Sequence, residues 1–98
     1  MKIEKDKYYL VRTEDTSVYF GRITEKDGQE VTMTECRCIW YWRGAASLNQ
    51  LANEGVKNPD DCKFTVTVDS LTALGVVEIL LCTQDAANNI KAVKEWRC

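Results

Sequence analysis

Residues 39–52 have the sequence IWYWRGAASLNQLA, and this stretch marks the point where a strand gives way to a helix. Its first four residues are β-branched or aromatic, which favours a strand. Ser47 is a good N-cap, and Gln50 three residues later completes a capping box, so a helix begins here. Leu48 and Leu51 lie on one face of that helix. The chain therefore combines strands with helices.

Strand-like segments lie on both sides of this stretch. Their β-branched and aromatic composition predicts strands over residues 7–13, 16–24, 30–42, 63–69 and 75–83. Asp27-Gly28 is a strong turn dipeptide between the second and third of them. The segment 75–83 (GVVEILLCT) is almost continuously apolar, which predicts a strand at the centre of the sheet.

The segment 30–42 alternates along its length, as a strand with two different faces does. One predicted face carries Val31, Met33, Ile39 and Tyr41. The other carries Thr32, Thr34, Cys36, Cys38, Trp40 and Trp42. Glu35 and Arg37 interrupt the apolar face, and a β-bulge or a polar site in mid-strand would explain them.

A second helix is predicted to begin at Thr83, which is a favourable N-cap. Its buried stripe is Ala86, Ile90 and Val93. With no repeat and no internal linker, residues 1–98 are expected to form a single domain. The predicted fold class is α+β: a mostly antiparallel, curved sheet of about five strands with two short helices. A small open barrel is the main variant.

Composition and charge exclude several classes of function. The formal net charge is −2, whereas non-specific DNA binding needs a broad basic face. The sequence contains no apolar run of the roughly 20 residues that span a membrane. The charged start (MKIEKDKYYLVRT) leads us to expect no signal peptide.

The residues that usually carry catalysis and metal binding are missing. The chain has no histidine, which removes the commonest general base and metal ligand. Five cysteines are present, but their spacing fits neither a disulfide framework nor a paired zinc motif, so free thiols are expected. We therefore expect no metal, no cofactor, no catalytic residues and no enzymatic activity.

Arginine and aromatic side chains remain as the candidate binding groups, because guanidinium groups hold phosphates and aromatic rings stack on bases. The expected ligand-binding residues are Arg12, Arg22, Arg37, Trp40, Trp42, Arg43, Gly44 and Ser47. The last three form a corner where a helix N-terminus could attract an anion. The alternative is that the tryptophans fill the core, the arginines face water and Ser47 satisfies the helix N-terminus itself.

Several segments resemble a family of small uncharacterised proteins of tailed phages and prophages, catalogued as a domain of unknown function. They are YLVRT, GQEVT, IWYWRGAASLNQLANEGVKNP, CKF, VVEILLCT and VKEW, spread over nearly the whole chain. The resemblance implies a viral accessory protein acting in the cytoplasm of a bacterial host. It supplies no catalytic residue.

Three functions fit these observations. The first is an oligomeric binder that sequesters a nucleotide-type signal of bacterial immunity, with its site formed between copies of the chain. The second is a protein–protein inhibitor of a host or defence protein, similar in role to an anti-CRISPR protein. The third is a structural or accessory part of the virion. The expected partner is accordingly either a nucleotide-type small molecule or a bacterial defence protein, and the chain is expected to form a homo-oligomer.

Overall fold

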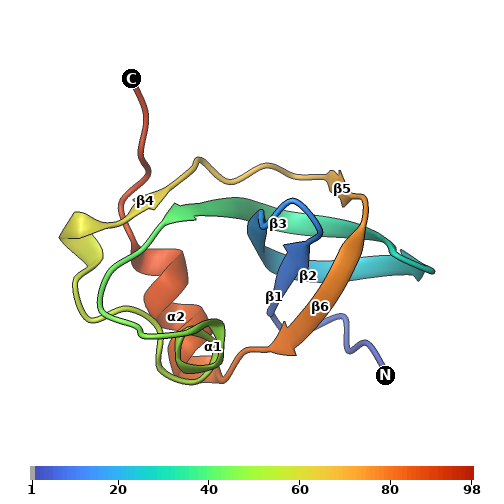
Figure 1. The fold of residues 1–98 in the computed structure, drawn as a ribbon, viewed down its shortest axis with the longest axis horizontal. Coiled ribbons are helices and arrows are strands. Elements are labelled where there is room, and N and C mark those ends of the chain that lie inside the picture. Colours follow the sequence, from blue (N-terminus) through green and yellow to red (C-terminus); the bar gives the residue numbers. More distant parts are fainter. Residues whose placement is uncertain (1) are drawn as a thin grey trace.

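The computed structural model describes residues 2–98 (Figure 1). Its strands are β1 (Tyr9–Thr13), β2 (Val18–Asp27), β3 (Glu30–Tyr41), β4 (Lys63–Phe64), β5 (Leu71–Ala73) and β6 (Val76–Leu81). Its helices are α1 (Leu48–Glu54), the short 3-10 helix η1 (Pro59–Asp61) and α2 (Gln84–Ala92). Both α-helices lie at one end of the molecule, and the β2–β3 hairpin projects from the other (Figure 1).

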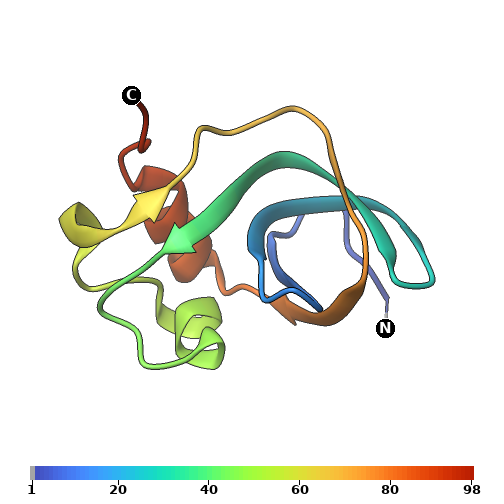
Figure 2. The same ribbon diagram turned by 45° about the horizontal axis from the view of Figure 1, so that its top comes forward.

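The strands form one antiparallel sheet in the order β4-β3-β2-β1-β6, and β5 pairs with another part of β3. The sheet curls back on itself, as Figure 2 shows. Among residues 2–98 no pairing joins β5 to β6, so the sheet stays open. The predicted α+β class with a curved sheet and two short α-helices is confirmed, with six strands rather than about five.

The predicted strands agree best with the structure in the first half of the chain. The segments 7–13, 16–24 and 30–42 become β1, β2 and β3, with shifted ends. The segment 63–69 forms only the two-residue β4, followed by one isolated bridge at Val68. Strand β5 was not predicted.

The predicted central position of segment 75–83 is wrong. Among residues 2–98, strand β6 lies at an edge of the sheet and pairs only with β1. Its sequence is almost continuously apolar for another reason. Leu80 packs against the core on one face of the sheet, and Ile79 packs against the core on the other. Two covered faces give an apolar run even when one edge of the strand is free.

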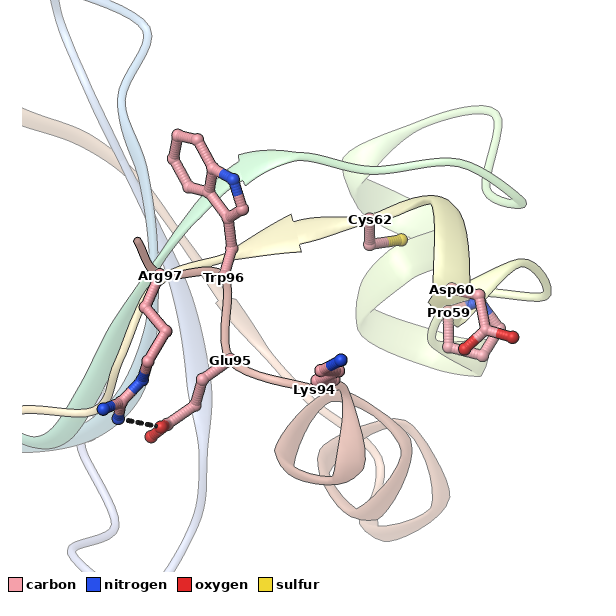
Figure 3. Close-up of a pocket in the computed structure, with 7 residues that line it drawn as sticks. All are labelled: Pro59, Asp60, Cys62, Lys94, Glu95, Trp96 and Arg97. Carbon is pink, nitrogen blue, oxygen red and sulfur yellow. Dashed lines mark hydrogen bonds and ion pairs between the residues drawn. The ribbon is translucent and has the colours of Figure 1, made fainter.

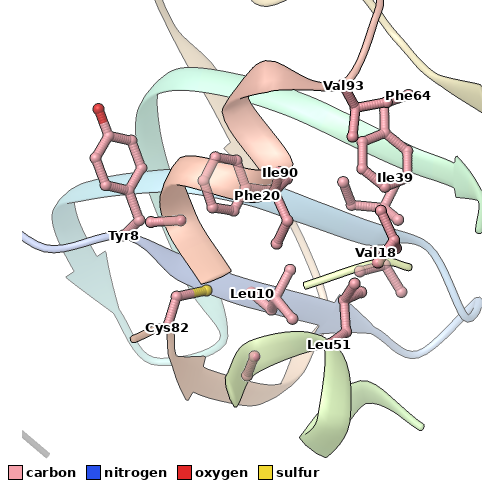
Figure 4. Close-up of a cluster of buried hydrophobic side chains, with 13 residues drawn as sticks. Tyr8, Leu10, Val18, Phe20, Ile39, Leu51, Phe64, Cys82, Ile90 and Val93 are labelled. Atoms are coloured by element: carbon pink, nitrogen blue, oxygen red, sulfur yellow. The ribbon is translucent and has the colours of Figure 1, made fainter. Parts of the chain in front are cut away.

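The sheet separates two hydrophobic cores. The helix-side core contains Tyr8, Leu10, Val18, Phe20, Ile39, Leu51, Ala52, Val56, Phe64, Cys82, Ala87, Ile90 and Val93 (Figure 4). The inner core lies inside the curl of the sheet and contains Tyr9, Val11, Ile23, Val31, Met33, Cys36, Ala73 and Val76. Strand β1 contributes side chains to both cores, because its side chains alternate between the two faces of the sheet.

A β-bulge in β3 sets which side chains enter which core. The register shifts so that Glu35 and Cys36 lie opposite the single residue Gly21 of β2. Glu35 has a φ of 49°, an unusual value for a residue with a side chain. A Cβ on Gly21 would lie 2.9 Å from the carbonyl oxygen of Thr34, so the two strands approach too closely there for a larger residue.

The bulge confirms one of the two predicted explanations for the break in the β3 pattern. It also corrects the predicted faces beyond it. Cys36 packs in the inner core with Met33, where strict alternation would place the two on opposite faces. Arg37 and Ile39 are both buried, and Ile39 belongs to the helix-side core.

The predicted helix caps are confirmed. Ser47 Oγ accepts a hydrogen bond from the Gln50 amide at 3.1 Å, and Thr83 Oγ1 accepts one from the Ala86 amide at 3.0 Å. Thr83 also links the two helices, because its hydroxyl donates to the carbonyl of Asn53, in α1, at 2.8 Å. Neither helix within residues 2–98 is long and apolar enough to cross a membrane.

Candidate functional site

Two exposed tryptophans stack on each other at the surface of the sheet. The ring centroids of Trp40 and Trp96 lie 5.0 Å apart, with 26° between the ring planes. Trp40 is 60% exposed and Trp96 is 46% exposed. Large aromatic side chains normally gain stability by burial, so a stacked pair left this open to solvent indicates a binding surface.

The two tryptophans come from opposite ends of the chain. Trp40 lies near the end of β3, next to β4 in the sheet. The C-terminal segment runs beside β4, because Glu95 forms a parallel bridge with Phe64. The amide of Trp96 donates to the carbonyl of Phe64 at 2.8 Å, which fixes the second tryptophan beside the first.

Lys63, in β4, places a positive charge beside this pair. Its Nζ lies 5.5 Å from the ring centroid of Trp40 and 5.4 Å from that of Trp96. An ammonium on the outer face of one ring would be much farther from the other ring, so these nearly equal distances put Lys63 at the side of the stack. Lys63 therefore covers neither outer ring face. We call Trp40, Lys63 and Trp96 the aromatic surface.

An open cleft of about 410 Å³ lies beside Trp96 (Figure 3). It is lined by Pro59, Asp60, Cys62, Lys94, Glu95, Trp96 and Arg97. Arg97 donates a hydrogen bond to Glu95, and this bond is the main cause that lowers the pKa of Glu95. With Glu95 neutralised by Arg97, Lys94 and Asp60 are the remaining charges of the cleft wall.

Trp42 is half-buried and is part of the packing around the helix-side core. It lies one residue beyond the end of β3, packs against the helix-side core and donates from Nε1 to the carbonyl of Ala45 at 3.2 Å. The expectation that tryptophans fill the core therefore fits Trp42 and is wrong for Trp40.

The corner formed by Arg43, Gly44 and Ser47 is packed against the loop before η1. A Cβ on Gly44 would lie 2.4 Å from the amide nitrogen of Lys57, so the loop before η1 leaves no room for a side chain at this position. Ser47 uses its hydroxyl oxygen to accept the Gln50 amide. Arg43 is exposed. The structure places these three residues together, with the loop before η1 packed closely against Gly44.

The other three predicted arginines contact carboxylates or carbonyls of the protein. Arg12 Nε lies 3.0 Å from Glu78 Oε1, and Arg22 Nε lies 3.1 Å from Glu35 Oε2. Arg37 is only 3% exposed and donates to four main-chain carbonyls. Arg37 is therefore a structural residue, and the expectation that it contacts a ligand is not supported.

A second polar cluster surrounds Tyr8. Its hydroxyl donates to Glu35 at 2.8 Å, and Lys91 Nζ lies 4.4 Å from its ring centroid. Tyr8 is stacked on Phe20 and buried, and Glu35 also pairs with Arg22. Arg22 Nε is buried and makes no hydrogen bond, although it lies close to the Glu35 carboxylate. The other groups contact one another, so the cluster stabilises the bulge and is a weaker candidate site than the aromatic surface.

Lys63 and Trp96 were not among the binding residues predicted from the sequence. The charged surroundings of Trp96 in VKEWRC could have indicated an exposed aromatic residue. Its pairing with Trp40 depends on the C-terminal segment folding back onto β4, and no local pattern predicts that contact. Among residues 2–98 the structure has no group of three or more cysteine and carboxylate residues arranged to hold a metal ion.

The structure thus defines a small α+β domain with an exposed aromatic surface beside an open cleft. Residues 6–90 match the family described as "Domain of unknown function (DUF6948)", so the chain belongs to that family. Comparisons with curated proteins and with solved structures gave no match.

Proposed function

We propose that this protein is a non-enzymatic binding protein that captures a nucleotide-type ligand on its aromatic surface. The stacked, exposed pair of Trp40 and Trp96 is the observation that carries the proposal. A base can stack on an outer ring face of either tryptophan, and each base–aromatic stack contributes about 1–3 kcal/mol. Lys63 beside the pair supplies a point charge for a phosphate.

The adjacent cleft has a suitable size for the rest of such a ligand. Its volume of about 410 Å³ lies within the range of roughly 300–1,000 Å³ that is usual for small-molecule sites. Lys94 in its wall adds a second cation. In this proposal the base stacks on a tryptophan, and the phosphate-bearing part extends toward Lys63 and Lys94.

The biological role that we propose is that of a phage accessory protein in the host cytoplasm. Sequestering a nucleotide-type immune signal requires tight binding and no chemistry. The lack of histidine and the exposed stacking surface are consistent with this role. The phage origin rests on the sequence resemblance alone.

A protein–protein inhibitor is the second candidate, and exposed Tyr41 favours it. Tyr41 follows Trp40 and is 45% exposed, so three large aromatic residues lie open near the end of β3. Tryptophan and tyrosine are the residues that most often dominate the binding energy of protein interfaces. A host or defence protein would then cover the surface that we assign to a nucleotide.

Thermal unfolding with a panel of cyclic nucleotides and ADP-ribose tests the proposal. A ligand at a hundred times its dissociation constant should stabilise the protein by about 2.7 kcal/mol, which raises its melting temperature by several degrees. Trp96→Ala and Trp40→Ala should lose this shift. Arg43→Ala should keep it, because Arg43 lies outside the aromatic surface.

The variants also separate the alternatives. If Arg43→Ala loses the shift and Trp96→Ala keeps it, the ligand binds at the corner before α1 and the proposed site is wrong. If no member of the panel shifts the wild-type protein, the nucleotide proposal fails for that panel and the protein–protein candidate takes first place.

A further inference from the structure

We infer that two copies of this chain associate through the free edge of β6, forming an antiparallel strand pair around a two-fold axis. Strand β6 (Val76–Leu81) is at the end of the sheet and pairs on one side only, with β1. A free edge offers a row of main-chain donors and acceptors to a second strand. This inference does not depend on the proposed ligand.

The hydrogen bonds to β1 show which groups of β6 are free. The amide of Cys82 donates to the carbonyl of Tyr8 at 2.9 Å, so Cys82 directs its main-chain groups toward β1. Main-chain direction alternates along an antiparallel ladder. Leu80, two residues earlier, therefore also faces β1, while Ile79 and Leu81 direct their N–H and C=O groups outward.

Within residues 2–98, other segments bond to this edge on both sides of Ile79 and Leu81 but not at these two residues. Just beyond the strand, the Thr83 amide donates to the carbonyl of Ala52, in α1, at 3.0 Å. At the beginning of β6, the Val76 amide donates to the carbonyl of Gln29 at 2.9 Å. Beyond that bond a groove of about 330 Å³ lies between β6 and the tip of the β2–β3 hairpin. A strand of a second copy has room to approach there.

The edge also exposes apolar side chains where natural edge strands usually carry protecting charges. Leu81 is 46% exposed, Val77 is 45% exposed and Leu74, just before the strand, is 68% exposed. Glu78 is the only charged residue of β6, and it is already paired with Arg12 at 3.0 Å. Burial of these apolar side chains would favour association.

A second copy fits this edge better than an unrelated strand because β6 is complementary to itself. A two-fold axis at Leu80 places Ile79 of each copy opposite Leu81 of the other. Both are outward-facing residues, so each such pair exchanges two main-chain hydrogen bonds. Glu78 then falls opposite Cys82 of the second copy, so the two Glu78 carboxylates do not face each other.

The pairing is short, so the dimer should form in a concentration-dependent way. Stable interfaces bury about 800 Å² per partner, and a few paired residues with three exposed apolar side chains cover a smaller surface. Sedimentation velocity of the full chain over a range of concentrations should show a monomer–dimer equilibrium. A monomer at every concentration would overturn the inference.

Hydrogen exchange tests the register in the wild-type protein. The amides of Ile79 and Leu81 should exchange fast at low concentration and become protected as dimer forms. The Leu80 amide bonds to β1 and should be protected throughout. A dimer in which the exchange of Ile79 and Leu81 does not change would show that another surface is used and would reject the edge.

Substitution gives an independent test with a matched control. Leu81→Lys places a charge opposite Ile79 of the second copy twice per dimer, and it should raise the dimer dissociation constant roughly tenfold or more. Val66→Lys is the control, because Val66 is similarly exposed (37%) and lies outside β6. Equal effects of the two substitutions, or no effect of Leu81→Lys, would contradict pairing through β6.

Discussion

The Nη1 atom of Arg37 lies 2.9 Å from the main-chain carbonyl oxygen of Val93, the residue that follows helix α2. The same nitrogen also donates to the carbonyl of Ile90 at 3.0 Å. The other two guanidinium nitrogens donate to the main-chain carbonyls of Phe64, in β4, and Thr65, the residue that follows β4. The Ile90 carbonyl also accepts the Val93 amide at 3.3 Å, so Arg37 adds a second donor there, and this one buried arginine ties the end of α2 to β4.

Arg37→Met should therefore be among the most destabilising single substitutions outside the hydrophobic cores. It removes the Arg37 donors from the Thr65 and Val93 carbonyls, whereas the Phe64 and Ile90 carbonyls keep main-chain amides as donors, and we expect a loss of about 3 kcal/mol in the free energy of unfolding. Arg37→Lys keeps the charge but cannot span the same four carbonyls, so it should lose less. Urea denaturation measures both changes.

The matched control is Arg43→Met, because Arg43 is exposed. It should change the free energy of unfolding by no more than about 0.5 kcal/mol. Equal stability of Arg37→Met and Arg43→Met would show that the buried hydrogen bonds of Arg37 contribute nothing.

Glu35 provides a second prediction, because its φ of 49° is unfavourable for any residue with a Cβ. Glu35→Ala and Glu35→Gly both remove the carboxylate that accepts from Tyr8 and pairs with Arg22. Only the glycine variant also removes the cost of the positive φ, because glycine has no Cβ. Glu35→Gly should be more stable than Glu35→Ala by about 1–2 kcal/mol, which reverses the usual order in strands. Thermal melts of the two variants decide this.

Much of the fold could be predicted from local pattern. The helix starts at Ser47 and Thr83 and the turn at Asp27-Gly28 depend on neighbouring residues, and all three agree with the structure. The edge position of β6 could not be predicted in this way. An apolar run indicates that both faces of a strand are covered, and it does not say whether both edges are paired.

The candidate site was predicted less well for a related reason. A strand pattern cannot distinguish a buried tryptophan from one exposed at a binding surface, and Trp42 and Trp40 are one of each kind. Arg37 is buried because it contacts the end of α2, which comes more than fifty residues later in the chain. Contacts between distant segments decide which arginines are free, and these contacts are not visible in the local sequence.

The buried cysteines predict a loss of stability at high pH. Burial raises the pKa of Cys36 and of Cys82 from 9.0 to about 12. Between these values the unfolded chain loses the thiol protons and the folded chain keeps them, so the free energy of unfolding falls as the pH rises from 9.0 toward about 12. Cys36→Ala should make this alkaline decline shallower. An unchanged slope in urea melts would show that the Cys36 pKa is not raised by burial.

The same burial predicts an order of thiol reactivity. Cys98 is exposed, whereas Cys36 and Cys82 are buried, and the thiolate is the reactive form. Cys98 should therefore react first with a thiol reagent at neutral pH, and the two buried thiols should react only on unfolding. Mass spectrometry of the labelled peptides measures the order, and early labelling of Cys36 would contradict it.

The aromatic surface predicts that Trp96 contributes little to folding. Its ring is 46% exposed and its main aromatic contact is Trp40, and such a stack is worth about 0.5–1.5 kcal/mol beyond its buried area. Phe64, whose main chain holds the Trp96 amide, is fully buried in the helix-side core. Phe64→Ala should therefore cost about 3–5 kcal/mol, and Trp96→Ala should cost less than half of that. Urea melts give both values, and acrylamide should quench the fluorescence of Trp40 and Trp96 more readily than that of the half-buried Trp42.

If Trp96→Ala unfolds the protein as Phe64→Ala does, the exposed stack is a structural contact. The main reason for placing a binding surface at this end of the sheet is then lost.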